Sequence, residues 1–207
     1  MKYIFAAGAP GSKWSSVVKN IYYSASIDRT DSTDSRQYYH DATGMSTPMH
    51  LGAYWDPGME FDIPEDCSQM TLTQAEIIFD QPFSGQGTRI IKSHVFGLRH
   101  NIEWLRSTWP NIPIVLVYRS TDACIGWWYR CGGWNIQYPN YHAYYANNDN
   151  LVRQTELQNA GVQWAINKYP RRSPKNNHEL ASMLGIDPPD TQWQHCYQEH
   201  DIQVEII

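Results

Sequence analysis

The sequence has few cysteines, no long apolar run and no excess of positive charge. Its four cysteines among 207 residues form no Cys-x-x-Cys pair, which excludes a disulfide-rich framework. A membrane-spanning helix needs about 18 or more consecutive apolar residues, and no such run occurs. The formal net charge of −5 at pH 7 argues against a general nucleic-acid binder. These features predict a cytoplasmic protein with reduced thiols.

Negative charge is concentrated between residues 28 and 66. This segment holds nine acidic and two basic side chains, a local net charge of −7, so the rest of the chain carries +2. Electric fields in clefts are local, and an anion-binding pocket is therefore compatible with an acidic chain. The acidic segment can serve as a lid, an acceptor site or a partner surface, and the sequence leaves these alternatives open.

The apolar pattern predicts an α/β fold in a single domain that spans residues 1–207. Near-continuous apolar runs predict buried strands, and apolar residues at helical spacing predict helices between them. We expect strands over 2–8, 75–80, 88–94 and 112–119, and helices over 12–23, 97–108, 121–131, 150–169 and 175–186. Gly161 indicates close packing inside its helix, and Gly185 indicates a left-handed cap. Such alternation is typical of a parallel β-sheet flanked by helices, here with long loops at 24–75 and 132–149.

A glycine-containing turn follows the first predicted strand. It reads Gly8, Ala9, Pro10, Gly11, Ser12, Lys13 and leads into the helix predicted over 12–23, which carries Trp14 and Ser15. The standard P-loop has four residues between its glycines and then Gly-Lys-Ser/Thr, and this turn lacks that spacing. A helix N-terminus nevertheless offers unpaired N–H groups and partial positive charge. The turn therefore predicts an anion site, with a simple strand-to-helix turn as the plain alternative.

Polar and basic residues also follow two other predicted strands. Lys92 and His94 are two residues apart, so in an extended strand end they point to the same side. Arg119 ends the most apolar strand, just before Ser120 and a predicted helix. Ligands of parallel sheets bind beyond the carboxyl ends of the strands. These residues are therefore expected to meet the glycine turn at one edge of the sheet.

Taken in order, these three segments resemble the cofactor motifs of sulfotransferases that use 3′-phosphoadenosine 5′-phosphosulfate (PAPS). The Gly8–Trp14 turn is similar to the family's 5′-phosphosulfate loop. The Lys92-Ser93-His94 segment is similar to its Lys-Thr-His segment, and residues 115–128 resemble its 3′-phosphate motif. The resemblance covers roughly residues 1–23, 88–131 and 177–187, and it implies a P-loop-like sulfotransferase fold. The loop aligns in two registers, and Gly126 stands where the family pattern has a serine.

The resemblance implies a sulfuryl transfer from PAPS to a hydroxyl or amine, with adenosine 3′,5′-bisphosphate as product and no metal. His94 is the implied general base, and Lys13 and Lys92 are the implied contacts of the leaving group. The implied cofactor-binding residues are Gly8, Pro10, Gly11, Ser12, Lys13, Trp14, Ser15, Arg119 and Ser120.

Aromatic residues in the two long loops are candidates for binding the acceptor. Rings with polar edges suit a small hydroxylated molecule or a carbohydrate. The candidates are Tyr39, His40, Trp55, Trp134 and Tyr138. Packing beneath the loops is an equally open interpretation of each ring.

Two other functions remain open at the level of sequence. One is an ATP-dependent P-loop kinase, in which Asp80 at the end of the predicted strand 75–80 would hold Mg²⁺. The other is a non-catalytic carbohydrate-binding module on a degraded sulfotransferase fold. The oligomeric state and the acceptor are not determined by the sequence.

Overall fold

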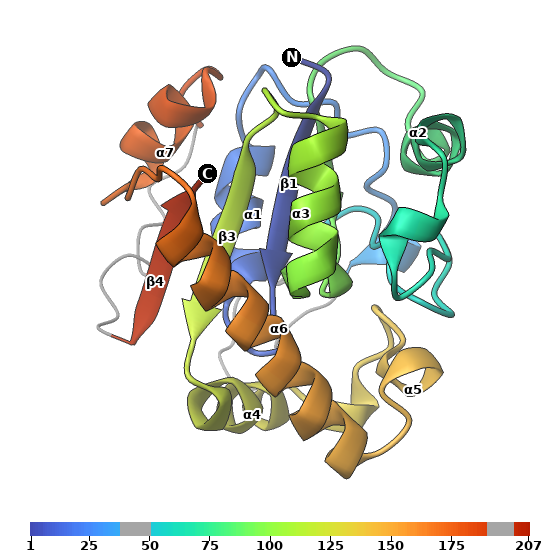
Figure 1. The fold of residues 1–207 in the computed structure, drawn as a ribbon. Helices are drawn as coiled ribbons and strands as arrows, with labels where there is room; N and C mark the ends of the chain where they lie inside the picture. Colours follow the sequence, from blue (N-terminus) through green and yellow to red (C-terminus); the bar gives the residue numbers. More distant parts are fainter. Residues whose placement is uncertain (38–50, 190–200) are drawn as a thin grey trace.

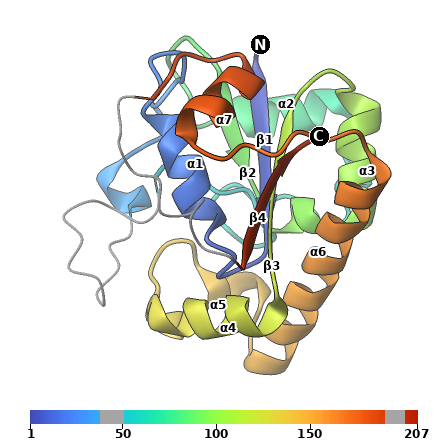
Figure 2. The same ribbon diagram turned by 90° about the vertical axis from the view of Figure 1, so that its left-hand side faces the viewer.

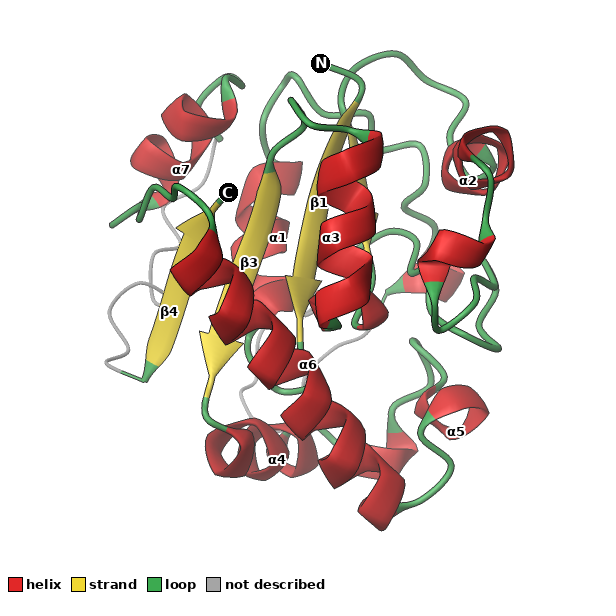
Figure 3. Ribbon diagram, in the orientation of Figure 1, coloured by secondary structure: helices red, strands yellow, loops and turns green. Residues whose placement is uncertain are grey.

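Four strands form one mixed β-sheet (Figures 1 and 3). The computed structural model describes residues 1–37, 51–189 and 201–207. The sheet order is β2-β1-β3-β4, with β1, β2 and β3 parallel and β4 antiparallel to β3. The strands are β1 (Tyr3–Gly8), β2 (Arg89–Lys92), β3 (Ile114–Arg119) and β4 (Ile202–Ile206). A mostly parallel sheet flanked by helices confirms the expected α/β class.

The helices follow the strands in alternation, as the sequence predicts for most of the chain. The α-helices are α1 (Trp14–Tyr22), α2 (Leu72–Asp80), α3 (Arg99–Thr108), α4 (Thr121–Arg130), α5 (Tyr141–Tyr144), α6 (Asn148–Lys168) and α7 (Asn177–Leu184). Short 3-10 helices are η1 (Asp34–Arg36), η3 (Cys67–Gln69), η4 (Val95–Gly97) and η5 (Gly133–Asn135). The loop expected at 132–149 therefore contains η5, α5 and the start of α6.

Helices cover both faces of the sheet (Figure 2). On one face, Ile4 of β1 packs in an apolar cluster with Leu180 of α7 and residues of α1. On the other face, Phe5 packs with Ile102 of α3 and Val162 of α6. Successive strand side chains point to opposite faces, so neighbouring residues of β1 contribute to different clusters. Because β1 is buried on both faces, its sequence is apolar throughout.

The prediction of a strand over residues 75–80 is wrong, because these residues belong to helix α2. Thr71 and Gln74 form a capping box that starts the helix. Ala75 and Phe79, four residues apart, are both buried, whereas Ile77 between them is 65% exposed. Burial four residues apart is the helical period, which the short apolar run Ile77–Phe79 concealed.

Residues 202–206 form the edge strand β4, an element that the sequence analysis does not predict. Val204 and Ile206 pack into the cluster on the α1–α7 face, and the strand pairs with β3 from Val115 to Arg119. Five residues at the end of a polar segment carry little periodic signal. Pairing with β3 therefore decides their conformation.

Two glycine predictions are confirmed. Gly161 lies where α6 passes η4 and α3, and a methyl group there would overlap the carbonyl oxygen of Gly97. Gly185 has a φ of 69° and caps the C-terminus of α7.

Cys67, Cys124 and Cys131 are buried free thiols, and Cys196 lies outside the described residues. Within the three described ranges, none of the helices has the length and apolar character that a membrane crossing requires.

Candidate functional site

The ends of three parallel strands meet at one edge of the sheet (Figure 1). Strand β1 is the middle strand of the three: its Ala6 pairs with Lys92 of β2, and its Gly8 pairs with Val117 of β3. The turn after Gly8, the segment after Lys92 and the end of β3 at Arg119 are therefore neighbours. This is the edge at which ligands of parallel sheets bind.

The turn between β1 and α1 packs tightly against helix α4. Gly11 has a φ of +78°, and a methyl group there would overlap the carbonyl oxygen of Cys124 in α4. The Ser12 amide donates to the Ala9 carbonyl at 3.0 Å, which closes the turn. Lys13 has a φ of 66° and precedes the first residue of α1. Only glycine fits the tight approach at position 11.

The hydroxyl of Ser12 is buried inside this turn without a hydrogen-bond partner among the described residues. Ser12 is 0% exposed, and its Oγ would lie 2.7 Å from a methyl group placed on Gly8. Pro10 contributes no N–H group to the turn. Ser15, in the first turn of α1, exchanges a hydrogen bond with the Tyr54 hydroxyl at 3.0 Å. A buried polar group without a partner is costly, and several other side chains in the described residues share this property, so the Ser12 hydroxyl is a candidate donor to a bound ligand or water.

His94 lies just beyond β2 and is held by Asp56. The distance from its Nδ1 to Asp56 Oδ2 is 2.5 Å, and both side chains are 0% exposed. Asp56 Oδ1 accepts hydrogen bonds from the Ser93 hydroxyl at 2.7 Å and from the amides of His94 at 2.9 Å and Val95 at 3.2 Å. The carboxylate therefore organises the whole turn after β2.

Aromatic rings surround the imidazole of His94. Ring centroids lie 4.9 Å away for Trp14, 5.9 Å for Tyr54, 5.6 Å for Tyr141 and 6.1 Å for Tyr145. The Tyr141 hydroxyl is 3.5 Å from Nε2. Burial raises the pKa of the Tyr141 hydroxyl, which therefore stays protonated at neutral pH. The imidazole is shielded from water, and Nε2 faces a phenol oxygen.

Lys92 is buried beneath residues 51–56 and not in the turn after β1. Its ammonium donates to the Leu51 carbonyl and lies 5.0 Å from the Tyr22 ring and 4.5 Å from the Tyr54 ring. Burial lowers the pKa of Lys92 to about 7, although the nearby carboxylate of Asp31 opposes this. Strand β2 ends at Lys92, and His94 has αR backbone angles, so the expected extended segment does not continue to His94, although both side chains contact Tyr54. This enclosed position disfavours the charged form of Lys92, which is the form that would contact a leaving group.

Arg119 connects β3 to the turn after β1. Its Nη1 donates to the Gly11 carbonyl at 3.4 Å, and its Nε donates to Asp201 Oδ2 at 2.7 Å. The Lys13 ammonium lies 4.0 Å from the centre of the Trp127 ring, and the Arg119 guanidinium lies 5.9 Å from the same ring. Two cations thus lie beside one indole, that of Trp127 in the second half of α4, and Ser120 is the N-cap residue of this helix.

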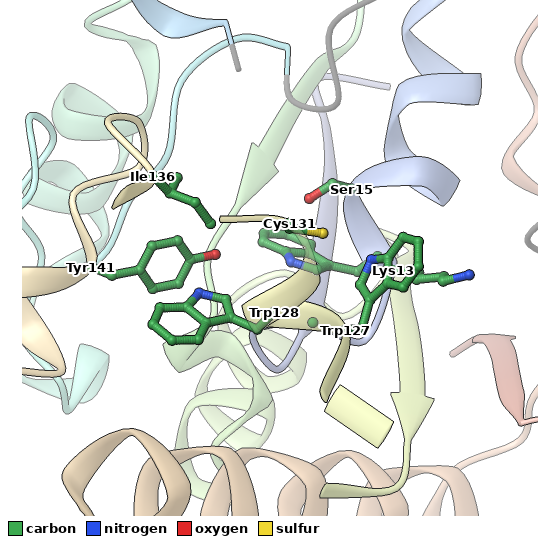
Figure 4. Close-up of a pocket in the computed structure, with 9 residues that line it drawn as sticks. Lys13, Ser15, Trp127, Trp128, Cys131, Ile136 and Tyr141 are labelled. Carbon is green, nitrogen blue, oxygen red and sulfur yellow. The ribbon is translucent and has the colours of Figure 1, made fainter. Parts of the chain in front are cut away.

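A pocket opens between this turn and the aromatic residues of α4 and α5 (Figure 4). Its cavity volume is about 30 Å³, which is room for one or two water molecules. The lining residues are Gly11, Lys13, Trp14, Ser15, Trp127, Trp128, Cys131, Ile136 and Tyr141. Lys13 extends away from Tyr141 and Trp128 (Figure 4). Burial raises the pKa of the Cys131 thiol to about 12, so this thiol is not a nucleophile at neutral pH.

The structure places the predicted acceptor residues in different environments. Trp55 is 0% exposed and packs between Phe61 and Phe83 in the core, so it is not available to an acceptor. Trp134 donates to Asn148 Oδ1 at 2.7 Å. The Tyr138 hydroxyl accepts a hydrogen bond from the Tyr54 amide. Tyr39 and His40 lie outside the described residues.

Two residues beside His94 are not singled out by the sequence, although Tyr141 belongs to the aromatic loop residues that could bind an acceptor. Asp56 is one of nine acidic residues in the segment 28–66, and nothing in the sequence distinguishes it from the other eight. Tyr141 lies in an aromatic-rich stretch where every ring carries the same signal. In the described ranges, no group of three or more His, Cys, Asp or Glu side chains is placed to hold a metal ion.

Comparisons of this chain with protein-family models, with curated proteins and with solved structures find no significant match. The geometry of the site therefore has to support any function by itself.

Proposed function

We propose that this protein is a PAPS-dependent sulfotransferase in which His94 is the general base. The observation that carries the proposal is the meeting of three segments at one sheet edge. They are the turn with the unpartnered Ser12 hydroxyl, the buried His94 with its carboxylate, and Arg119 bound to the turn through the Gly11 carbonyl. Each matches, in chain order, a segment that resembles a sulfotransferase motif.

The residues of the turn suit a bound phosphosulfate. The first-turn N–H groups of α1 and the buried Ser12 hydroxyl are donors, and Lys13 and Arg119 supply positive charge close by. PAPS supplies the sulfuryl group and leaves as adenosine 3′,5′-bisphosphate. In this proposal, Lys13 and the turn stabilise charge on the leaving oxygen. Arg119 and Ser120, at the start of α4, hold the 3′-phosphate.

His94 accepts the proton of the acceptor hydroxyl or amine at Nε2. The acceptor oxygen or nitrogen forms a bond to sulfur while the bond from sulfur to the phosphate oxygen breaks. The Tyr141 hydroxyl occupies the space beside Nε2, so an acceptor reaches the base only when that side chain moves. The pocket lined by Trp128, Ile136 and Tyr141 adjoins this position, and in this proposal the same movement of Tyr141 widens it for the acceptor.

The position of Asp80, the residue that would hold Mg²⁺ in a kinase, argues against the kinase alternative. Asp80 lies on α2, where it accepts a hydrogen bond from Tyr3 and pairs with Lys2 and Arg89. Tyr3 is the first residue of β1, and the anion-binding turn follows the last residue of the same strand. Asp80 is therefore at the opposite edge of the sheet from the site.

The proposal is tested by calorimetric titration with adenosine 3′,5′-bisphosphate, beside ATP with Mg²⁺. We expect the bisphosphate to bind and ATP to bind more weakly. Arg119→Ala is expected to weaken bisphosphate binding by about 10-fold to 100-fold, the usual effect of a charge-assisted hydrogen bond to phosphate. Asp201→Asn is the matched control, because it removes the partner of Arg119 and leaves the guanidinium in place. This variant is expected to bind the bisphosphate at least as tightly as the wild type.

Turnover is tested by release of the bisphosphate from PAPS in the presence of hydroxylated acceptors. His94→Gln is expected to abolish release while bisphosphate binding persists. Preference for ATP with Mg²⁺ would overturn the proposal in favour of a kinase. Binding of neither nucleotide, or full turnover by His94→Gln, would also contradict it.

A further inference from the structure

Asp56 makes one contact with the imidazole of His94 and three with the backbone and side chain around it. Its Oδ2 faces Nδ1 at 2.5 Å, and its Oδ1 accepts from Ser93 Oγ and from the amides of His94 and Val95. Both side chains of the pair are 0% exposed, so no water competes for these bonds. The two oxygens of one carboxylate thus have separate partners.

This division of contacts decides which ring nitrogen carries the hydrogen. An ionised carboxylate only accepts hydrogen bonds, so a bond between Oδ2 and Nδ1 requires the hydrogen on Nδ1. In the neutral imidazole, Nε2 then has a lone pair and no hydrogen. That lone pair is directed at the side from which Tyr141 approaches, with Oη 3.5 Å from Nε2.

We propose that Asp56 is the positioning residue of the catalytic base, and that it holds His94 in the tautomer whose Nε2 accepts the proton. The role of the base in sulfuryl transfer rests on the proposed function, whereas the tautomer is a property of the folded chain. In the reaction, the acceptor O–H proton moves to Nε2, and the hydrogen on Nδ1 stays on Nδ1, where it is donated to the Asp56 carboxylate. The imidazolium that forms faces the carboxylate charge, which stabilises it.

The substitution Asp56→Asn tests this role because the surrounding hydrogen-bond donors fit the asparagine carboxamide in one orientation. The three donors around Oδ1 need an acceptor, so the carboxamide oxygen takes that position. The amide NH₂ then faces Nδ1 and donates to it. His94 must therefore carry its hydrogen on Nε2, and the lone pair that accepts the proton is lost.

The tautomer is measured by two-bond ¹H–¹⁵N spectra of the imidazole, with His94→Gln identifying the His94 signals among those of the eight histidines. In the wild-type protein we expect Nδ1 to be protonated and Nε2 unprotonated. Asp56→Asn should exchange the two. Ser93→Ala is the matched control, because it removes one donor to Oδ1 and leaves the contact between Oδ2 and Nδ1. This variant should keep the wild-type tautomer.

Turnover provides the second measurement. Asp56→Asn is expected to lower kcat by about 10²-fold to 10⁴-fold, the usual contribution of a general base, while the Kd of adenosine 3′,5′-bisphosphate stays unchanged. A wild-type spectrum with the hydrogen on Nε2 would overturn the proposal even if Asp56→Asn failed to fold. Equal turnover of Asp56→Asn and wild type would overturn it as well. An exchanged tautomer in a protein without sulfuryl transfer would instead reject the proposed function and leave the assignment of Asp56 standing.

Discussion

At the residue scale, the most unusual side chain is the buried Lys92. Its ammonium is enclosed by the Leu51 carbonyl, the rings of Tyr22 and Tyr54, and the nearby Asp31 carboxylate. Burial lowers the pKa of this lysine from the ordinary 10.5 to about 7. Below pH 7 the native state must therefore hold a charge in a site that disfavours it.

Replacing Lys92 with methionine is expected to change how stability depends on pH. Between pH 7 and pH 10.5 the unfolded chain carries the Lys92 proton and the folded chain does not, so the free energy of unfolding of the wild type rises with pH in this window. Methionine does not titrate, so Lys92→Met lacks this rise. Each pKa unit corresponds to about 1.4 kcal/mol, and the total change is on the order of several kcal/mol.

The measurement is urea unfolding of both proteins at pH 6 and pH 9. Loss of the hydrogen bond to Leu51 lowers the free energy of unfolding of the variant by the same amount at both pH values. The quantity to compare is therefore the difference in the free energy of unfolding between wild type and variant at each pH. We expect this difference to shift in favour of the wild type at pH 9. An equal difference at the two pH values would show that Lys92 titrates normally.

At the element scale, Gly161 sets how closely α6 crosses η4 and the start of α3. A methyl group at this position would overlap Gly97 O and lie 2.6 Å from the Arg99 amide nitrogen, and both of these are backbone atoms that cannot rotate away. Gly126 of α4 is also within a helix, is exposed and has no atom within 4 Å of such a methyl group. Substituting alanine at these two glycines therefore distinguishes the effect of close packing on stability from the effect of helix propensity.

Gly161→Ala is expected to destabilise the protein by about 1–3 kcal/mol, the usual cost of overpacking. Gly126→Ala is expected to stabilise it by up to about 1 kcal/mol, because alanine favours the helix. Thermal or urea unfolding of the two variants beside the wild type measures both effects. Similar effects of the two substitutions would show that α6 does not approach Gly97 as closely as described.

At the scale of the whole molecule, β4 closes the sheet on the side of β3. Val204 and Ile206 fill the cluster on the α1–α7 face, and the Ile207 amide and the Ile114 carbonyl share a hydrogen bond of 3.1 Å. Without β4, the backbone of β3 becomes an open edge at the centre of the fold. Open edge strands pair with other chains and aggregate.

Deletion of residues 202–207 is therefore expected to unfold or aggregate the protein, although these residues lie far from His94 in the sequence. Size-exclusion chromatography and circular dichroism measure this. Gln203→Ala is the control, since Gln203 is only partly buried and its amide donates to Glu205 on the same strand. That variant should remain folded. A monomeric, folded deletion variant would show that β4 is dispensable.

The elements that the sequence predicts well are those with a strong local signal. The apolar run of β1, the capping glycine of α7 and the periodicity of α6 are readable because burial and backbone geometry act on adjacent residues. The short run in α2 is misread because three consecutive apolar residues fit either a strand or a helix. Its capping box, Thr71 with Gln74, is the signal that favours the helix.

The sequence by itself determined the α/β class, the turn after β1 and the order of the segments around His94 and Arg119. Those features follow from apolar periodicity and from residue types placed next to strand ends. Only the tertiary structure decided that Asp56 orients His94, that Tyr141 faces Nε2 and that Lys92 is buried beneath residues 51–56. Asp56 lies 38 residues from His94 along the chain, and Tyr141 lies 47 residues from it. No local sequence pattern encodes a contact over such a separation.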